Sequence, residues 1–175
     1  MSESGSQDTD SAALLTMRTQ LHTFVVLSEG KVVVAATRDT VLIGIQEHKS
    51  AVFLKDVRFI WRELRSNDPI TCIEARERPR TGLNKDTKGK SRIIDLVIGL
   101  IRGEMIIYED VLYKLIAAEQ PKKANAADTA FSPRKLHWHR EAVSTIKWSL
   151  DGNYLISGGR ETVLVLWQLA TGKKQ

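Results

Sequence analysis

The chain has 175 residues, of which 42% are hydrophobic and 27% charged, and this composition is typical of soluble globular proteins. The net charge of +5 suits an acidic partner such as RNA, but many proteins without such a partner share it. The longest apolar run, Ile93 to Ile101, has nine residues and contains Asp95, whereas a bilayer-spanning helix needs roughly 20. The polar start of the chain predicts no signal peptide, and Cys72 has no second cysteine for a disulfide. These features exclude membrane, secreted and fibrous classes.

Residues 1–12 are small, polar and acidic, and they predict a disordered tail. From residue 13 to residue 175, short apolar or alternating runs recur between Gly, Asp, Asn and Pro. Val, Ile, Thr and aromatic residues dominate these runs, and few show a helical stripe, so the pattern predicts an all-β chain of short strands. In chain order the expected strands lie at residues 24–27, 31–36, 41–45, 57–61, 70–75, 93–99, 105–108, 111–116, 136–138, 143–148, 154–157 and 163–169.

An internal repeat organises these runs. Residues 38–45 match residues 160–167 at an offset of 122, and the same offset aligns the pair at 29–30 with the pair at 151–152. The alignment therefore predicts a turn and two strands duplicated without a gap. A weaker third copy covers residues 102–108, and the equivalent strand ends are Ile45, Tyr108 and Trp167.

The repeat predicts about three four-stranded blades of a β-propeller, near residues 20–56, 57–117 and 136–175. The intervals between copies exceed the roughly 40–45 residues of a blade, and two polar stretches, 76–92 and 117–135, account for the excess as inserted loops. Because three blades do not close a ring, we expect an incomplete, N-terminal propeller segment, with closure by other blades left open.

The last copy, residues 136–167, resembles a WD repeat over its full length. In that family a His, a Ser or Thr, an acid and a Trp form a buried hydrogen-bond chain. The resemblance assigns this chain to His139, Ser157, Glu161 and Trp167. Glu161 departs from the Asp that the family prefers, and Gln168 stands where the second letter of the WD pair would be.

The two earlier copies are degenerate. The first has Met17, Ala35 and Ile45 where the family has His, Ser or Thr, and Trp, and the second has Arg102 where the acid should be. We therefore expect apolar packing alone to hold these two blades.

A narrower resemblance covers residues 136–175, which look like WD-repeat subunits of the small-subunit processome. It implies a non-catalytic nucleolar scaffold, without a cofactor, that supports transcription and processing of pre-ribosomal RNA in the transcription-linked subcomplex. The implied partners are other WD-repeat processome subunits and pre-ribosomal RNA or a small nucleolar ribonucleoprotein. The alternative is a WD-repeat adaptor in another nuclear or cytosolic complex.

The insert at residues 76–92 has a net charge of +5 and could neutralise RNA phosphates, or it could be a solvated loop that touches nothing. The candidate contacts are Arg76, Arg78, Arg80, Lys85, Lys88, Lys90 and Arg92. Within it, Gly89-Lys90-Ser91 invites a phosphate-loop interpretation and an enzyme, but Asn84 replaces the first glycine of that motif and a strand follows.

The remaining polar groups give no catalytic constellation. His137 and His139 flank Trp138 without a third metal ligand nearby in sequence, and Cys72 is expected to be a small core residue. Ser132, in Ser-Pro-Arg-Lys, is a candidate phosphorylation site for a proline-directed kinase.

Overall fold

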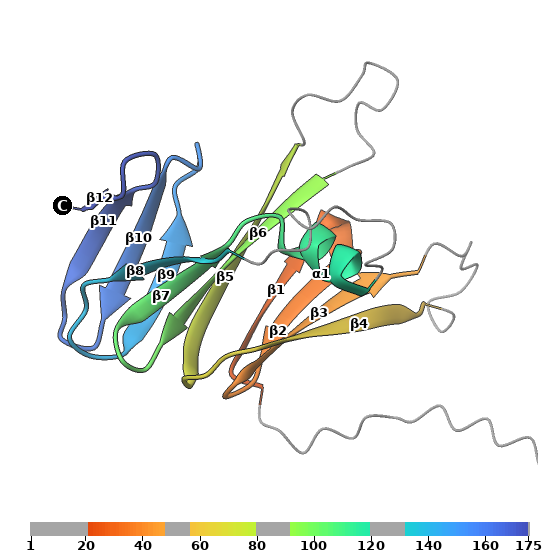
Figure 1. Cartoon of the computed structure of the whole chain (residues 1–175), viewed down its shortest axis with the longest axis horizontal. Helices are drawn as coiled ribbons and strands as arrows, with labels where there is room; N and C mark the ends of the chain where they lie inside the picture. Colours follow the sequence, from red (N-terminus) through yellow and green to blue (C-terminus); the bar gives the residue numbers. More distant parts are fainter. Residues whose placement is uncertain (1–20, 48–56, 80–91, 120–131, 175) are drawn as a thin grey trace, which may run out of the picture.

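The computed structural model describes residues 21–47, 57–79, 92–119 and 132–174. It confirms the all-β class: the described residues form three four-stranded antiparallel sheets and one α-helix (Figure 1). The first sheet holds β1 (Thr23–Leu27), β2 (Val32–Ala36), β3 (Thr40–Gln46) and β4 (Phe59–Arg65). The second holds β5 (Ile70–Pro79), β6 (Arg92–Leu100), β7 (Glu104–Tyr108) and β8 (Arg134–His137). The third holds β9 (Val143–Trp148), β10 (Tyr154–Gly159), β11 (Leu164–Gln168) and β12 (Lys173–Lys174).

The sheets stand side by side, with the second between the other two (Figure 1). One apolar core fills the junction of the first and second sheets, and includes Val34, Ile43 and Leu96. Another fills the junction of the second and third, and includes Val97, Ile146 and Trp167. Because both faces of the second sheet are covered, every residue of β6 except Arg92 is buried, including Asp95.

Sheet membership differs from the expected division of the chain. The run near residue 57, assigned to the second blade, is β4 and closes the first sheet beside β3. The run at 136–138, assigned to the third blade, lies in β8 and closes the second sheet beside β7. The first and second sheets therefore each take their fourth strand from the start of the next expected blade, because hydrogen bonding joins that strand to the preceding hairpin.

One expected strand, residues 111–116, is a helix. It forms the beginning of α1 (Val111–Glu119), and Val111, Leu112 and Leu115 pack into the core between the first and second sheets. Leu115 follows Val111 by four residues and Leu112 by three, and these spacings place the side chains on one face of a helix. The short strand β12 was not expected.

Strands and the helix α1 extend into the ends of the two expected inserts. Arg76 to Pro79 belong to β5 and Arg92 to β6, and residues 117–119 and 134–135 belong to α1 and β8. Residues 80–91 and 120–131, and the predicted tail at 1–12, lie outside the described part of the chain.

The gapless alignment of first and third copies is wrong by one residue. In the first sheet Val33 pairs with Gly44, whereas in the third Leu155 pairs with Trp167, so the turn between these strands is one residue longer in the third sheet. A shift of one residue moves a side chain to the other face of the sheet. Gly44, and not Ile45, therefore occupies the position of Trp167.

Candidate functional site

The four residues assigned to the WD hydrogen-bond chain meet at the junction of second and third sheets. Trp167 Nε1 in β11 donates to Ser157 Oγ in β10 at 2.9 Å, and the hydroxyl lies 2.7 Å from His139 Nε2. His139 Nδ1 contacts Glu161 Oε1. Three of these side chains are buried, so the indole, hydroxyl and imidazole satisfy one another where water is excluded.

Glu161 reaches His139 although it is one carbon longer than the Asp that the family prefers. A Cβ atom at Gly159 would overlap the Glu161 carboxylate, so this glycine leaves room for the longer side chain. Partial burial would raise the pKa of Glu161, but its own backbone N–H and the hydrogen bond with His139 lower it below the ordinary value.

The first sheet fills the same place differently. The Trp61 ring, from β4, lies over Gly44, where a Cβ atom would approach Cζ3 of Trp61 to 2.7 Å. Phe59 packs beside Trp61 with ring centroids 5.9 Å apart. In the third sheet the aromatic ring comes from β11 itself. In the first sheet it comes instead from β4, the strand beside β3.

Among the seven basic candidates for RNA contact, the three described ones form internal ion pairs. Arg76 lies opposite Asp95 across β5 and β6, and Arg78 lies two residues further on the same face. Arg76 Nε lies 3.1 Å and Arg78 Nε 2.6 Å from Asp95 Oδ2, while Arg92 Nε lies 3.2 Å from Glu77 Oε1. The other four, Arg80, Lys85, Lys88 and Lys90, lie outside the described residues.

Asp95 is the centre of this cluster and is only 1% exposed. Burial would raise the pKa of this carboxyl, but Arg78, the backbone N–H of Asp110 and the charge of Arg76 together hold the pKa below its ordinary value. Asp95 is therefore ionised at neutral pH. It ties the end of β5 to the residue that precedes α1, since Asp110 N donates to Asp95 Oδ1 at 3.1 Å.

Arg76 extends the cluster to the third sheet. Its Nη1 donates to the carbonyl oxygen of Gly152 at 2.6 Å, and its guanidinium lies 3.9 Å from the centre of the Trp148 ring. The sequence predicted this residue as a candidate RNA contact in an inserted basic loop. The signal that could have placed it was Asp95, the only acid in an otherwise apolar strand, which needs a cationic partner when buried.

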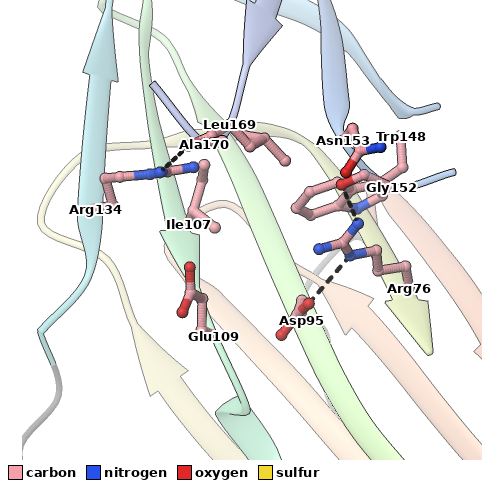
Figure 2. A pocket seen from close by; sticks show the side chains of 10 residues that line it. All are labelled: Arg76, Asp95, Ile107, Glu109, Arg134, Trp148, Gly152, Asn153, Leu169 and Ala170. Carbon is pink, nitrogen blue, oxygen red and sulfur yellow. Dashed lines mark hydrogen bonds and ion pairs between the residues drawn. The ribbon is translucent and has the colours of Figure 1, made fainter. Parts of the chain in front are cut away.

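A polar pocket of about 220 Å³ opens beside this cluster, between the second and third sheets (Figure 2). Arg134 reaches across it, and its Nη1 donates to the carbonyl oxygen of Leu169 at 2.7 Å. Among the described residues, Arg134 Nε and Trp148 Nε1 are buried donors without a hydrogen-bond partner. The pocket is lined by both signs of charge, since Asp95 and Glu109 stand with Arg76 and Arg134. This arrangement links two sheets and contains no nucleophile beside a base.

The other singled-out residues lie apart from this pocket. His137 and Ser132 are exposed, and Cys72 is buried in the core between second and third sheets, where burial raises the pKa of its thiol to about 11. Across the described ranges, no group of three or more His, Cys, Asp or Glu residues could hold a metal ion. In the same ranges, no helix is long and apolar enough to cross a membrane.

Comparison with curated proteins finds short but clear sequence similarity, whereas no family model matches the chain. U3 small nucleolar RNA-associated protein 17 of Schizosaccharomyces pombe is 51% identical over 45 residues, which are 26% of this chain and 6% of that protein. NET1-associated nuclear protein 1 of Saccharomyces cerevisiae is 50% identical over 42 residues, and human WD repeat-containing protein 75 is 44% identical over 48. The match spans 24% of this chain and 5% of the budding-yeast protein, and 27% and 6% for the human one.

Solved WD40 domains share the fold at low sequence identity. The C-terminal WD40 domain of Sif2 has a TM-score of 0.53 at 17% identity, covering 89% of this chain and 36% of that one. The WD40 repeats of RRP9 have a TM-score of 0.54 at 14% identity, covering 90% and 38%. Together with the His139 chain in the third sheet, these findings show that the chain has the WD-repeat β-propeller fold and is similar, over a short stretch, to U3 small nucleolar RNA-associated protein 17 and WD repeat-containing protein 75.

Proposed function

We propose that this chain is part of a non-catalytic WD-repeat scaffold of the small-subunit processome. In this role it supports pre-ribosomal RNA transcription and processing in the nucleolus, within the transcription-linked subcomplex. The observation that carries the proposal is the 51% identity to a protein named for association with U3 small nucleolar RNA, in a chain with the WD40 fold.

The sheet junctions suit a scaffold, which must hold binding surfaces at fixed relative positions. Besides the apolar core, several side chains tie the second sheet to the third. Thr71 Oγ1 donates to the carbonyl oxygen of Val143 at 2.5 Å, and Lys147 Nζ donates to Glu74 Oε2 at 2.6 Å. Such links favour one packing of the sheets, so that loops on either edge keep their relative positions.

The proposal is tested by purifying the tagged full chain from cells and identifying the RNA and proteins recovered with it. We expect pre-ribosomal RNA, a small nucleolar ribonucleoprotein and other WD-repeat processome subunits, and a fluorescent fusion should concentrate in the nucleolus. Recovery of an unrelated complex without RNA would favour the adaptor alternative. Specific ATP binding by the purified chain would instead support an enzyme that uses Gly89-Lys90-Ser91.

Direct RNA contact is proposed for the four remaining basic candidates, Arg80, Lys85, Lys88 and Lys90. Their simultaneous replacement by glutamate should weaken binding to pre-ribosomal RNA and flatten its dependence on salt, by a slope of up to about 0.9 for each lost phosphate contact. The matched control replaces four exposed cations on other segments by glutamate, namely Lys31, Arg58, Lys173 and Lys174. An equal loss in both variants would show a general charge effect and no contact by this segment.

A further inference from the structure

The three sheets end in outer strands of different length and character. β4 is the last strand of the first sheet, β8 of the second and β12 of the third (Figure 1). β8 has four residues and begins with Arg134 and Lys135, and β12 consists of Lys173 and Lys174. Short outer strands with basic side chains discourage a further strand from pairing with them. β4 is longer, with seven residues, and it carries exposed apolar side chains.

The backbone of β4 pairs with the sheet on one side. Glu47 N donates to the carbonyl oxygen of Arg58 at 2.9 Å, and Ser66 N donates to that of Asp39 at 2.8 Å, at the two ends of the β3–β4 pairing. An antiparallel pair bonds through every second residue, so the even-numbered residues of β4 face β3. The odd-numbered residues direct their N–H and C=O groups away from the sheet, and no strand in the described part of the chain pairs with them. These residues are Phe59, Trp61, Glu63 and Arg65.

Apolar side chains flank these outward backbone groups on both faces of the sheet. Trp61 is 51% exposed and Ile60 is 48% exposed, and adjacent residues of a strand point to opposite faces. The Trp61 ring lies over Gly44 with Phe59 packed beside it, so the ring has a fixed place at the margin of the sheet. An exposed apolar outer strand with unpaired backbone groups is a template for another strand.

The hydrogen-bonding pattern of this strand decides the class of partner. Each outward residue offers one backbone donor and one backbone acceptor. A second polypeptide strand supplies both in the matching order. The phosphates of a nucleic acid accept hydrogen bonds and donate none, so they would leave the carbonyl oxygens of β4 unpaired.

The charges of β4 decide the kind of polypeptide segment. Arg62 and Arg65 outnumber Glu63, and the Arg65 side chain is 83% exposed, with its Nη2 3.8 Å from Glu63 Oε2. Acidic side chains opposite the arginines would form cross-strand pairs of opposite charge, which stabilise a sheet. A second copy of this chain would instead bring the same arginines and the same net charge of +5.

We propose that the outward side of β4 adds a strand from an acidic partner protein, which pairs antiparallel with β4 and covers Trp61 and Ile60 with apolar side chains. The antiparallel direction continues that of the β2–β3 and β3–β4 pairs in the same sheet. The proposal goes beyond the processome assignment and does not depend on it.

The test uses the full chain and a fluorescein-labelled peptide, Glu-Thr-Thr-Glu-Val-Val-Thr, in fluorescence anisotropy titrations. In the antiparallel register its first and fourth residues, both glutamate, lie opposite Arg65 and Arg62. Its fifth and sixth residues, both valine, lie opposite Trp61 and Ile60. N-methylation of the third and fifth residues removes N–H groups that face β4 and should abolish measurable binding. N-methylation of the fourth and sixth residues, whose N–H groups face away, should leave binding unchanged.

Two variants of the chain separate backbone pairing from charge. Glu63→Pro removes an N–H that points away from the sheet, and an outer strand tolerates proline at such a position. This variant should weaken peptide binding by about tenfold or more, because the lost donor and the proline ring both hinder pairing. Glu63→Ala is the matched control of the same charge and should bind at least as tightly as the unchanged chain. Circular dichroism must show equal folding of both variants.

Three results would overturn the proposal. One is the absence of measurable peptide binding by the folded chain. Another is equal binding of the two N-methylated peptides, which needs no variant of the chain and would show that the backbone of β4 does not pair with the probe. The third is a dimer of the unchanged chain in sedimentation experiments that Glu63→Pro dissociates, which would make a second copy the occupant. Each result is independent of which proteins and RNA the tagged chain recovers from cells.

Discussion

The first and third sheets are built from copies of one repeat, pack against opposite faces of the same central sheet, and are held in different ways. The third sheet contains the His139–Ser157–Trp167 hydrogen-bond chain, and side chains such as Arg76 tie it to the second sheet. The first sheet relies on its apolar core, with the Ser28 hydroxyl donating to Glu77 Oε1 at 2.6 Å as a polar link. A four-stranded sheet of this strand order can therefore form without the hydrogen-bond chain, provided that its apolar core remains filled.

The largest expected difference in stability is between substitutions of Trp167 and Trp61, the two tryptophans that fill the equivalent place in the third and first sheets. Trp167→Ala should lower the free energy of unfolding by about 3–5 kcal/mol, because it empties a buried site and leaves the Ser157 hydroxyl without its indole donor. Trp61→Ala should cost only about 1–2 kcal/mol, since that ring is half-exposed on the outer face of the first sheet. Urea denaturation of both variants measures the difference, and equal losses would show that the two sheets are not held differently.

The next effect concerns the ion cluster that ties the third sheet. Asp95→Asn should cost about 3 kcal/mol at neutral pH, because Arg76 and Arg78 lose a buried anionic partner. Because the folded-state pKa of Asp95 is lowered, its contribution is present above the ordinary carboxyl pKa of about 4 and is lost as the pH falls through the lowered value.

The loss of unfolding free energy that Asp95→Asn causes, measured against the unchanged chain, should therefore become smaller as the pH falls below about 4. Denaturation at neutral pH and at pH values below 4 tests this dependence. Asp68→Asn is the control, since its pairing with the exposed Arg102 should be worth at most about 1 kcal/mol. A pH-independent deficit for Asp95→Asn would contradict an ionised Asp95.

A smaller difference in stability is expected between alanine substitutions at two glycines with positive φ, Gly103 and Gly30. Gly103 (φ +82°) has no room for a side chain against His139, so Gly103→Ala should cost about 2–3 kcal/mol and disturb the junction of second and third sheets. At Gly30 (φ +91°), in a turn of the first sheet, an added Cβ atom would meet nothing within 4 Å, and Gly30→Ala should cost about 1 kcal/mol from backbone conformation alone. Thermal denaturation compares them, and a costlier change at Gly30 would be inconsistent with this packing.

The smallest expected change in stability concerns the position that carries the hydroxyl of the hydrogen-bond chain, which is Ser157 in the third sheet and Ala35 in the first. Ser157→Ala should cost about 1–2 kcal/mol, because His139 Nε2 and Trp167 Nε1 lose their common partner. Ala35→Ser should also destabilise, by about 1 kcal/mol, because Gly44 stands in the first sheet where Trp167 supplies the indole donor to Ser157 in the third. A stabilising Ala35→Ser would mean that the first sheet keeps a hidden polar partner, and chemical denaturation can detect either sign.

Much of the fold was predictable because it rests on local patterns. Alternating Val, Ile and aromatic residues predicted eleven of the described strands, and the repeat indicated four strands in each unit. The assignment of His139, Ser157, Glu161 and Trp167 came from the resemblance of one contiguous copy, residues 136–167, to a WD repeat. These patterns survive because a strand buries its side chains with period two wherever it lies.

The tertiary structure decided the features that depend on neighbours remote in sequence. Residues 111–116 form a helix because one face can pack into the core between two sheets. A turn one residue shorter than that of the third sheet places Gly44, and not Ile45, opposite Val33. Arg76 and Arg78 changed from candidate RNA contacts into internal ion pairs because Asp95 lies on the strand beside them. The sequence by itself determined which residues alternate and repeat; only the packed sheets decided which faces are covered, because burial and charge pairing depend on what lies across each strand.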